Sequence, residues 1–298
     1  MEARKKSKLV DILLLGMIIL PFIVGMALKI CFTPPSEGTN ITGALVFFTI
    51  PMPLMDLPIT ESQVNSALVI IALWGLCLYL TRNLSVKPQS KRQLVAEWIV
   101  EKVQNLVDEN MGERFKHYAP FIAAIMGLSA FSSLACLVGL YSPTSDVNIV
   151  AGWAILVFIL ITYYKLQGGL LNYLKGFIEP VPLFLPCNII GEFATPLSMS
   201  FRHYGNVLSG SVIATLLAAA LGGASEAVLG WLPGVLGDIP FLQIGIPAVL
   251  SMYFDIFSGL MQAFIFAMLT MLNIALNFPE EAYERRMAKR KNKALHAA

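Results

Sequence analysis

The stretch Pro196-Leu-Ser-Met-Ser-Phe-Arg202-His-Tyr-Gly-Asn206-Val-Leu-Ser209-Gly-Ser211 constrains the rest of the chain, because it places an arginine deep inside a long apolar segment. A central arginine costs roughly 2.5–3.5 kcal/mol on translocon insertion scales, so it requires a partner or a task. Two interpretations remain open. The arginine either neutralises a buried carboxylate, or performs a function, which is the usual reason for an intramembrane charge. Polar residues recur around it at helical steps and share one face: Thr195, Ser198, Arg202, Asn206 and Ser209.

The composition indicates an integral membrane protein. Of 298 residues, 56% are hydrophobic and only 13% are charged, and the mean hydropathy is +0.70; a soluble domain needs more polar surface. The net charge of +2 is too small to suggest a nucleic acid partner. There is no GxxxxGK[ST] or GxGxxG motif for a nucleotide, no CxxC pair, and the three histidines are far apart, so neither a cofactor nor a metal is expected.

Hydrophobic runs predict an all-α, polytopic protein of about six membrane segments. The first run contains a passable cleavage site at Gly25-Met-Ala27, but it exceeds the usual signal-peptide core of about 7–15 residues, so we favour a retained span. The expected spans are 10–32, 61–80, 118–140, 149–164, 186–222 and 241–278. They divide the chain into N-terminal spans (1–80), a charged loop (81–117), a domain of four spans that holds the arginine stretch (118–278) and a basic tail (279–298), expected to be partly disordered.

The last two segments are too long for a straight crossing. Each would form a helix of roughly 55 Å, against a hydrocarbon core of about 30 Å. They must therefore tilt strongly, bend, or run partly along the membrane. We expect them to form a strongly tilted hairpin, with 223–240 as its connection.

The charged loop 81–117 contains a predicted helix that begins at Ser90, with Gln93 completing a capping box. Its apolar residues fall on one face, which favours a helix at the membrane interface over a solvated loop. These residues are Val95, Trp98, Ile99, Val103 and Leu106.

The basic residues predict the orientation. Of the 21 Lys and Arg, 19 lie before residue 10, in 81–117, in 165–185 or in the tail, and none lies in 33–60, 141–147 or 223–240. The positive-inside rule then places both termini in the cytoplasm. The remaining two are Lys29 and Arg202.

The hairpin would gather the polar groups of its two segments. Arg202 and Gln262 are equally far from the inner ends of their segments, so they should lie at similar depth. Asp255 should lie further outward, near the level of Ser209 and Ser211, whereas Asn188 and Glu192 should lie on the inner side of Arg202. The result is a pair of half-pores with a fixed cation between them.

These motifs resemble subunit a of the F-type ATP synthase. The most specific similarity covers about 186–278, and weaker similarity at Tyr118-Ala-Pro120 and Ser145-Asp146-Val-Asn148 extends it over most of the chain beyond about residue 60. The most specific motifs are Pro186-x-Asn188-x-x-x-Glu192, the arginine stretch and Asp255-x6-Gln262-Ala-Phe-Ile-Phe-x-Met-Leu-Thr270.

The resemblance implies a non-catalytic stator subunit in a bacterial inner membrane that carries protons, or Na⁺, to and from the carboxylates of a rotating c-ring. Arg202 would face those carboxylates, with Asn206 and Gln262 as its polar neighbours. The implied partners are the c-ring, the peripheral-stalk b subunits and the lipid bilayer. The alternative is a secondary transporter that uses Arg202 as a substrate or counter-ion site, although the sequence shows no inverted repeat.

Two positions depart from the family pattern. Gly210-Ser211 stands where the family commonly has Gly-Glu, so we expect Asp255 to take over as the acid of the outer half-channel. His203-Tyr204 replaces a usual apolar pair. His203 is either an additional proton relay or a polar residue at a subunit contact, and we prefer the contact.

Overall fold

A computed structural model describes residues 2–32, 43–53, 56–86, 90–178, 182–229, 245, 249–250 and 252–295; within these ranges side chains are described from residue 9 to 285 and at 287 and 288. Six helical stretches in the described part are long and apolar enough to cross a membrane, which confirms an all-α polytopic protein. They span Leu9–Phe32, Glu61–Thr81, Glu113–Val138, Val147–Gln167, Pro182–Val228 and Tyr253–Leu276.

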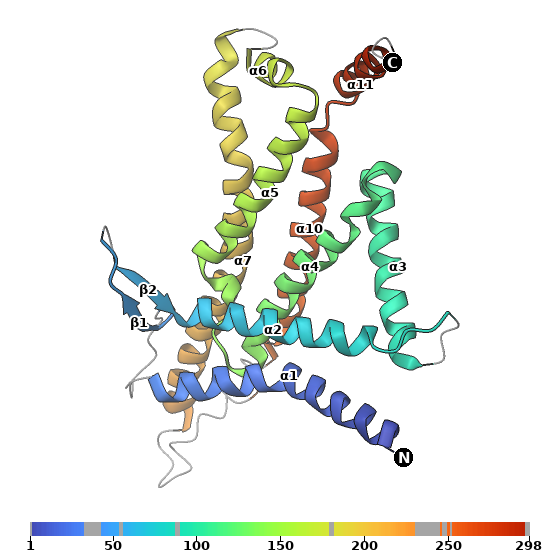
Figure 1. Ribbon diagram of the computed structural model, residues 1–298. Coiled ribbons are helices and arrows are strands. Elements are labelled where there is room, and N and C mark those ends of the chain that lie inside the picture. Colours follow the sequence, from blue (N-terminus) through green and yellow to red (C-terminus); the bar gives the residue numbers. More distant parts are fainter. Residues whose placement is uncertain are drawn as a thin grey trace.

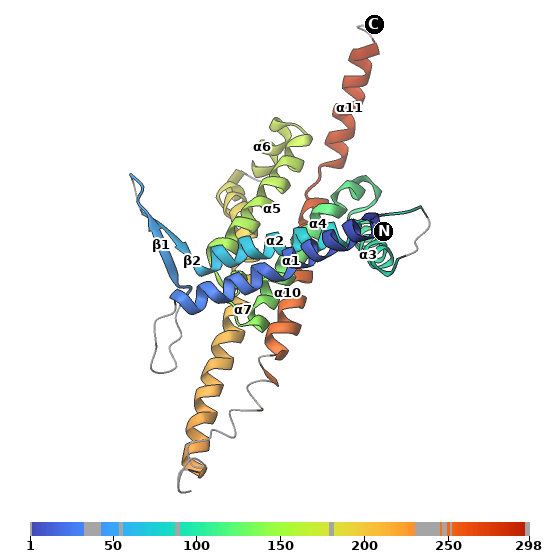
Figure 2. The same cartoon turned by 60° about the horizontal axis from the view of Figure 1, so that its bottom comes forward.

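Two helices run across the others. Helices α1 (Glu2–Phe32) and α2 (Glu61–Thr81) lie side by side and cross α4 (Ala119–Leu134), α5 (Val147–Gln167) and α7 (Leu185–Leu229) steeply (Figures 1 and 2). The 21 residues of α2 extend about 31 Å, which matches the bilayer core without tilt. The 45 residues of α7 extend about 67 Å, about twice the thickness of the bilayer core, so α7 cannot cross the core upright and remain within it. The crossing agrees with the strong tilt expected from length.

The sixth segment differs from its expected bounds. A π-helical stretch, Tyr253–Ser258, leads into α10 (Gly259–Leu276), and most of the expected residues before 253 lie outside the described part of the chain. Helix α7 continues to Leu229, so the connection expected to begin at 223 is wrong at its start. The alanines and leucine of 224–229 are good helix formers, which outweighs Gly223.

The charged loop 81–117 forms α3 (Lys91–Met111), and the backbone N–H of Gln93 donates to Ser90 Oγ at 3.2 Å, which confirms the predicted cap. The Gln93 side chain instead accepts from the backbone N–H of Ser85 at 3.1 Å, so the reciprocal half of the predicted capping box does not form. The residues of the expected apolar face of α3 do not share one environment in the structure. Val103 is buried in the core, whereas Val95 and Trp98 are exposed. The outward residues can still meet a membrane interface, which stays a prediction.

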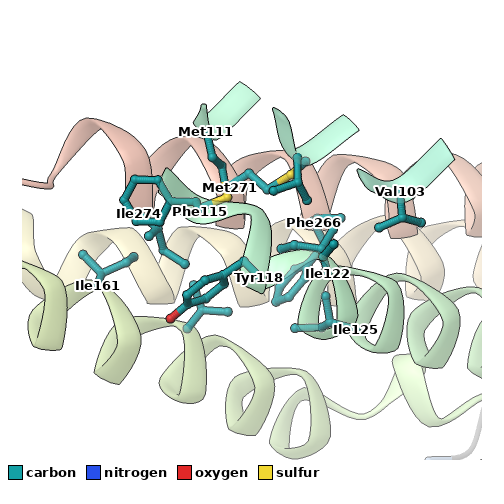
Figure 3. Close-up of a cluster of buried hydrophobic side chains, with 14 of the residues drawn as sticks. Val103, Met111, Phe115, Tyr118, Ile122, Ile125, Ile161, Phe266, Met271 and Ile274 are labelled. Carbon is teal, nitrogen blue, oxygen red and sulfur yellow. The ribbon is translucent and has the colours of Figure 1, made fainter. Parts of the chain in front are cut away.

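The core lies between α3, α4, α5 and α10 and includes the short 3₁₀ helix Glu113–Tyr118 (Figure 3). Phe115 packs edge-on against Tyr164 and Phe278, with ring centroids 5.4 and 5.6 Å apart. Where α10 begins and α4 ends, a Cβ at Gly259 would lie 2.7 Å from Ser133 Cβ, so the two helices approach closely there.

Three shorter elements complete the fold. An antiparallel hairpin of β1 (Val46–Ile50) and β2 (Leu57–Thr60) forms between the first two spans; its β-branched and aromatic residues suit strands. Helix α6 (Leu170–Ile178) links α5 to α7 through the 3₁₀ turn Pro182–Phe184. Two further 3₁₀ turns, Ala135–Val138 and Pro143–Ser145, lie between α4 and α5.

The tail forms a helix, α11 (Glu280–Leu295), so the expectation of partial disorder is wrong for these residues (Figure 2). Glu280 and Glu281 in its first turn suit the positive end of the helix dipole. Arg114 contacts the same turn, with a nitrogen 3.5 Å from Glu280 Oε1.

Candidate functional site in the membrane hairpin

Arg202 lies on the exposed face of α7. Its neighbours on the polar stripe, Ser198, Asn206 and Ser209, are exposed as well. Among the described residues, no carboxylate lies within 4.0 Å of its guanidinium, and Glu192 pairs elsewhere. Among the residues that the structure describes, Arg202 therefore neutralises no carboxylate of its own chain. A guanidinium stays charged at any physiological pH, so this face of α7 presents a permanent cation.

Asn206 and Gln262 join the two segments of the hairpin. Asn206 Nδ2 lies 2.7 Å from Gln262 Oε1, and the Gln262 side chain is buried. The structure thus brings Gln262 to α7 one helical turn from Arg202, as the comparison of depths predicted.

Asp255 lies at the level expected of it. A Cβ at Gly210 would sit 3.2 Å from Phe254 Cβ, so the backbone beside Ser209 and Ser211 contacts the turn that carries Asp255. Asp255 is partly buried, whereas Ser211 is exposed and its hydroxyl donates to the carbonyl of Leu208 at 2.9 Å. At the level of Ser209 and Ser211, the carboxylate is therefore that of Asp255 on the sixth segment.

Toward the start of α7 from Arg202, on the side predicted to be the inner one, a cavity of about 450 Å³ lies between α5, α6 and α7. Asn188 and Glu192 line this cavity. Asn188 Nδ2 donates to the carbonyl of Phe177 at 2.9 Å. Lys165 and Tyr173 line it too, and sequence reasoning missed them. Lys165 had counted only as one of the cytoplasmic basic residues, because nothing in its spacing links α5 to α7.

His203 points into the protein. Its side chain is fully buried; Nε2 lies 3.3 Å from Ser129 Oγ, and the ring packs edge-on against Trp153 and Phe266. The preferred subunit contact is therefore wrong. The reason is helical geometry: His203 follows Arg202 by one residue, about 100° around the helix, and so faces α4, α5 and α10.

A buried polar network at the start of α2 was also missed. Tyr141 N donates to Glu61 Oε1 at 3.3 Å, and Asn65 Nδ2 donates to the Tyr141 carbonyl at 2.9 Å. Ser62 Oγ donates to Asp146. Glu61, Ser62 and Asn65 are all buried, and their helical spacing at the start of a span was the available signal.

The fold and the site define a polytopic membrane protein whose tilted hairpin carries a fixed cation between two groups of polar residues. The comparisons with known proteins agree. The model of the family described as "ATP synthase A chain" matches residues 63–275, which is well over half of the chain. The chain therefore belongs to the ATP synthase A chain family.

Individual relatives support the same assignment. "ATP synthase subunit a" of Bacillus subtilis (strain 168) is 35% identical over 224 residues, covering 70% of this chain and 87% of the relative. "ATP synthase subunit a, sodium ion specific" of Propionigenium modestum is 29% identical over 283 residues, covering 84% of this chain and 89% of the relative. Helix α1 lies outside the residues matched by the family model.

Proposed function

We propose that this chain is the ion-conducting stator subunit of an ATP synthase membrane sector and provides two half-channels to the carboxylates of a c-ring. The observation that carries the proposal is Arg202: a cation within a membrane span, exposed on α7, with no carboxylate partner among the described residues. A partner from another subunit would satisfy this charge. The secondary-transporter alternative has no comparable support, because the relatives are ATP synthase subunits.

Arg202 would act on a c-ring carboxylate as it passes. The guanidinium favours the ionised carboxylate, so the proton or Na⁺ carried there is released toward the inner half-channel. The same charge repels a free cation that would otherwise cross from one half-channel to the other. Asn206 and Gln262 would hold α7 and α10 together beside this point.

The polar groups divide into the two proposed paths. The inner path is the cavity lined by Asn188 and Glu192. The outer path contains Asp255 at the level of Ser209 and Ser211, and the network of Glu61 and Asp146 lies toward its mouth.

We place the protein in a bacterial cell membrane with both termini in the cytoplasm, beside the c-ring and the peripheral-stalk b subunits. It would act without a nucleotide site of its own. The transported ion is H⁺ or Na⁺; one relative is named sodium ion specific, so the family alone does not decide between them.

The test replaces Arg202 in the assembled complex. Arg202→Ala should abolish ion-driven ATP synthesis, and Arg202→Lys should not rescue it, because lysine loses the planar fork and can deprotonate when buried. Purification without cross-linking should recover the c-ring and stalk subunits with both variants. Active synthesis by Arg202→Ala, alone or combined with Glu192→Gln or Asp255→Asn, would refute the role.

A further inference from the structure

The inner cavity is electrically balanced. Among the described residues that line it, Lys165 and Glu192 alone carry charge, and they contact each other, with Lys165 Nζ 2.6 Å from Glu192 Oε2. Their side chains are only 20% and 13% exposed, so bulk salt screens the pair weakly. The other carboxylate oxygen faces the Tyr173 hydroxyl at 3.5 Å.

Tyr173 keeps its proton in this position. Burial, together with the nearby Glu192 carboxylate, raises the pKa of Tyr173, so the phenol can donate to Glu192 Oε1. Both oxygens of Glu192 therefore face a donor from the protein. A metal cation in the cavity would therefore compete with the Lys165 ammonium and the Tyr173 hydroxyl for the carboxylate.

The other lining groups would suit a metal cation if the carboxylate were free. Asn188, Thr195 and Asn277 place amide and hydroxyl oxygens around the same cavity, and oxygen is the ligand that hard cations prefer. A proton needs no vacant ligand position, since it can pass between waters and hydroxyl groups. An ammonium group paired with the carboxylate would therefore exclude a metal cation and not a proton.

We propose that Lys165 is a specificity-determining residue of the exit half-channel: it occupies the Glu192 carboxylate in place of an alkali-metal cation and so keeps Na⁺ out of a path open to protons. This inference rests on the proposed function, because it takes the cavity to be the exit half-channel.

The test uses the complete ATP synthase in inverted membrane vesicles, where the cytoplasmic face is accessible to added salt. ATP-driven proton pumping is measured with increasing NaCl against N-methylglucamine chloride at equal ionic strength. The wild type and Lys165→Arg should pump equally in both salts. Lys165→Gln should be inhibited severalfold by Na⁺ in a saturable manner, and Lys165→Gln combined with Glu192→Gln should lose that inhibition.

Lys175→Gln is the matched control, because Lys175 is a nearby lysine of α6 that does not line the cavity. It should behave as the wild type. A pumping Lys165→Gln enzyme that is insensitive to Na⁺ overturns the inference while leaving the proposed function intact. If the proposed function itself were wrong, the result would be different: Arg202→Ala would pump protons at the wild-type rate.

Cys187 gives a second readout that needs only the inserted chain, because this cysteine lines the cavity. With the other three cysteines replaced, cationic and anionic thiosulfonates are compared. Lys165→Gln should raise the ratio of cationic to anionic labelling rates roughly fivefold, since it leaves a net negative charge in the cavity. An unchanged ratio would overturn the inference even if the variant does not pump.

Discussion

Asn206 of α7 and Gln262 of α10 form a hydrogen bond in the middle of the membrane hairpin, with Nδ2 2.7 Å from Oε1, and Gln262 is only 2% exposed. The two amides hold together the two helices that carry Arg202 and Asp255. Because Asn206 is exposed on α7 while Gln262 is buried, the two partners are not equivalent.

Asn206→Ala should therefore destabilise the hairpin by about 1–3 kcal/mol, because it leaves the buried Gln262 oxygen without its partner. Gln262→Leu should cost less, since it removes the buried polar group as well. Thermal unfolding of the purified complex, compared in a double-mutant cycle, measures both. Thr215→Ala is the control, because Thr215 Oγ1 donates to the carbonyl of Ser211 within its own helix and so does not join two helices. Equal losses for the two variants would contradict the asymmetry.

Asp255→Asn should slow ion-driven ATP synthesis, and adding Ser211→Glu should partly restore it. The physical reason is proximity: Gly210 contacts Phe254, so a carboxylate introduced at 211 lies near the position of the lost one. Glu226→Gln, a change at an exposed acid further along α7, should leave the rate unchanged. Full synthesis rates in Asp255→Asn vesicles would remove Asp255 from the outer path.

Both termini should be cytoplasmic. Ser142 and Thr144 are buried, so the 141–147 turn is a poor target for labelling, and Thr49 on the exposed hairpin strand is a better one. In a cysteine-free background, Thr49→Cys should react with a membrane-impermeant maleimide in intact cells. Met287→Cys on α11 should react only after the cells are opened. The reverse pattern would invert the topology.

His203 should matter for packing and not for ion transfer. His203→Ala removes a fully buried side chain between Trp153 and Phe266 and should lower stability by about 2–4 kcal/mol. His203→Leu, which refills the volume, should keep most of the stability and the full pumping rate per assembled complex. A well-assembled His203→Leu enzyme that pumps slowly would instead support a proton relay.

Much of the site was predictable because helical spacing and depth are properties of the chain itself. The spacing of Arg202, Asn206 and Ser209 predicted that they share one face of a helix. The equal number of residues from Arg202 and from Gln262 to the ends of their segments predicted that the two lie at similar depth. The prediction that His203 lies at a subunit contact was wrong because it depended on contacts between helices. Arg202 faces outward from α7, but the sequence does not show which helices of the same chain cover the side of α7 that carries His203.

The sequence by itself determined the membrane character, the six spans, the polar stripe and the need for tilt, because each follows from hydropathy, helical periodicity or length along one segment. Only the tertiary structure decided which side chains meet between segments: Lys165 with Glu192, His203 with Ser129, and Arg202 with no carboxylate among the described residues. Such pairings depend on how helices far apart in the chain rotate and pack, and hydropathy along each segment does not encode that rotation.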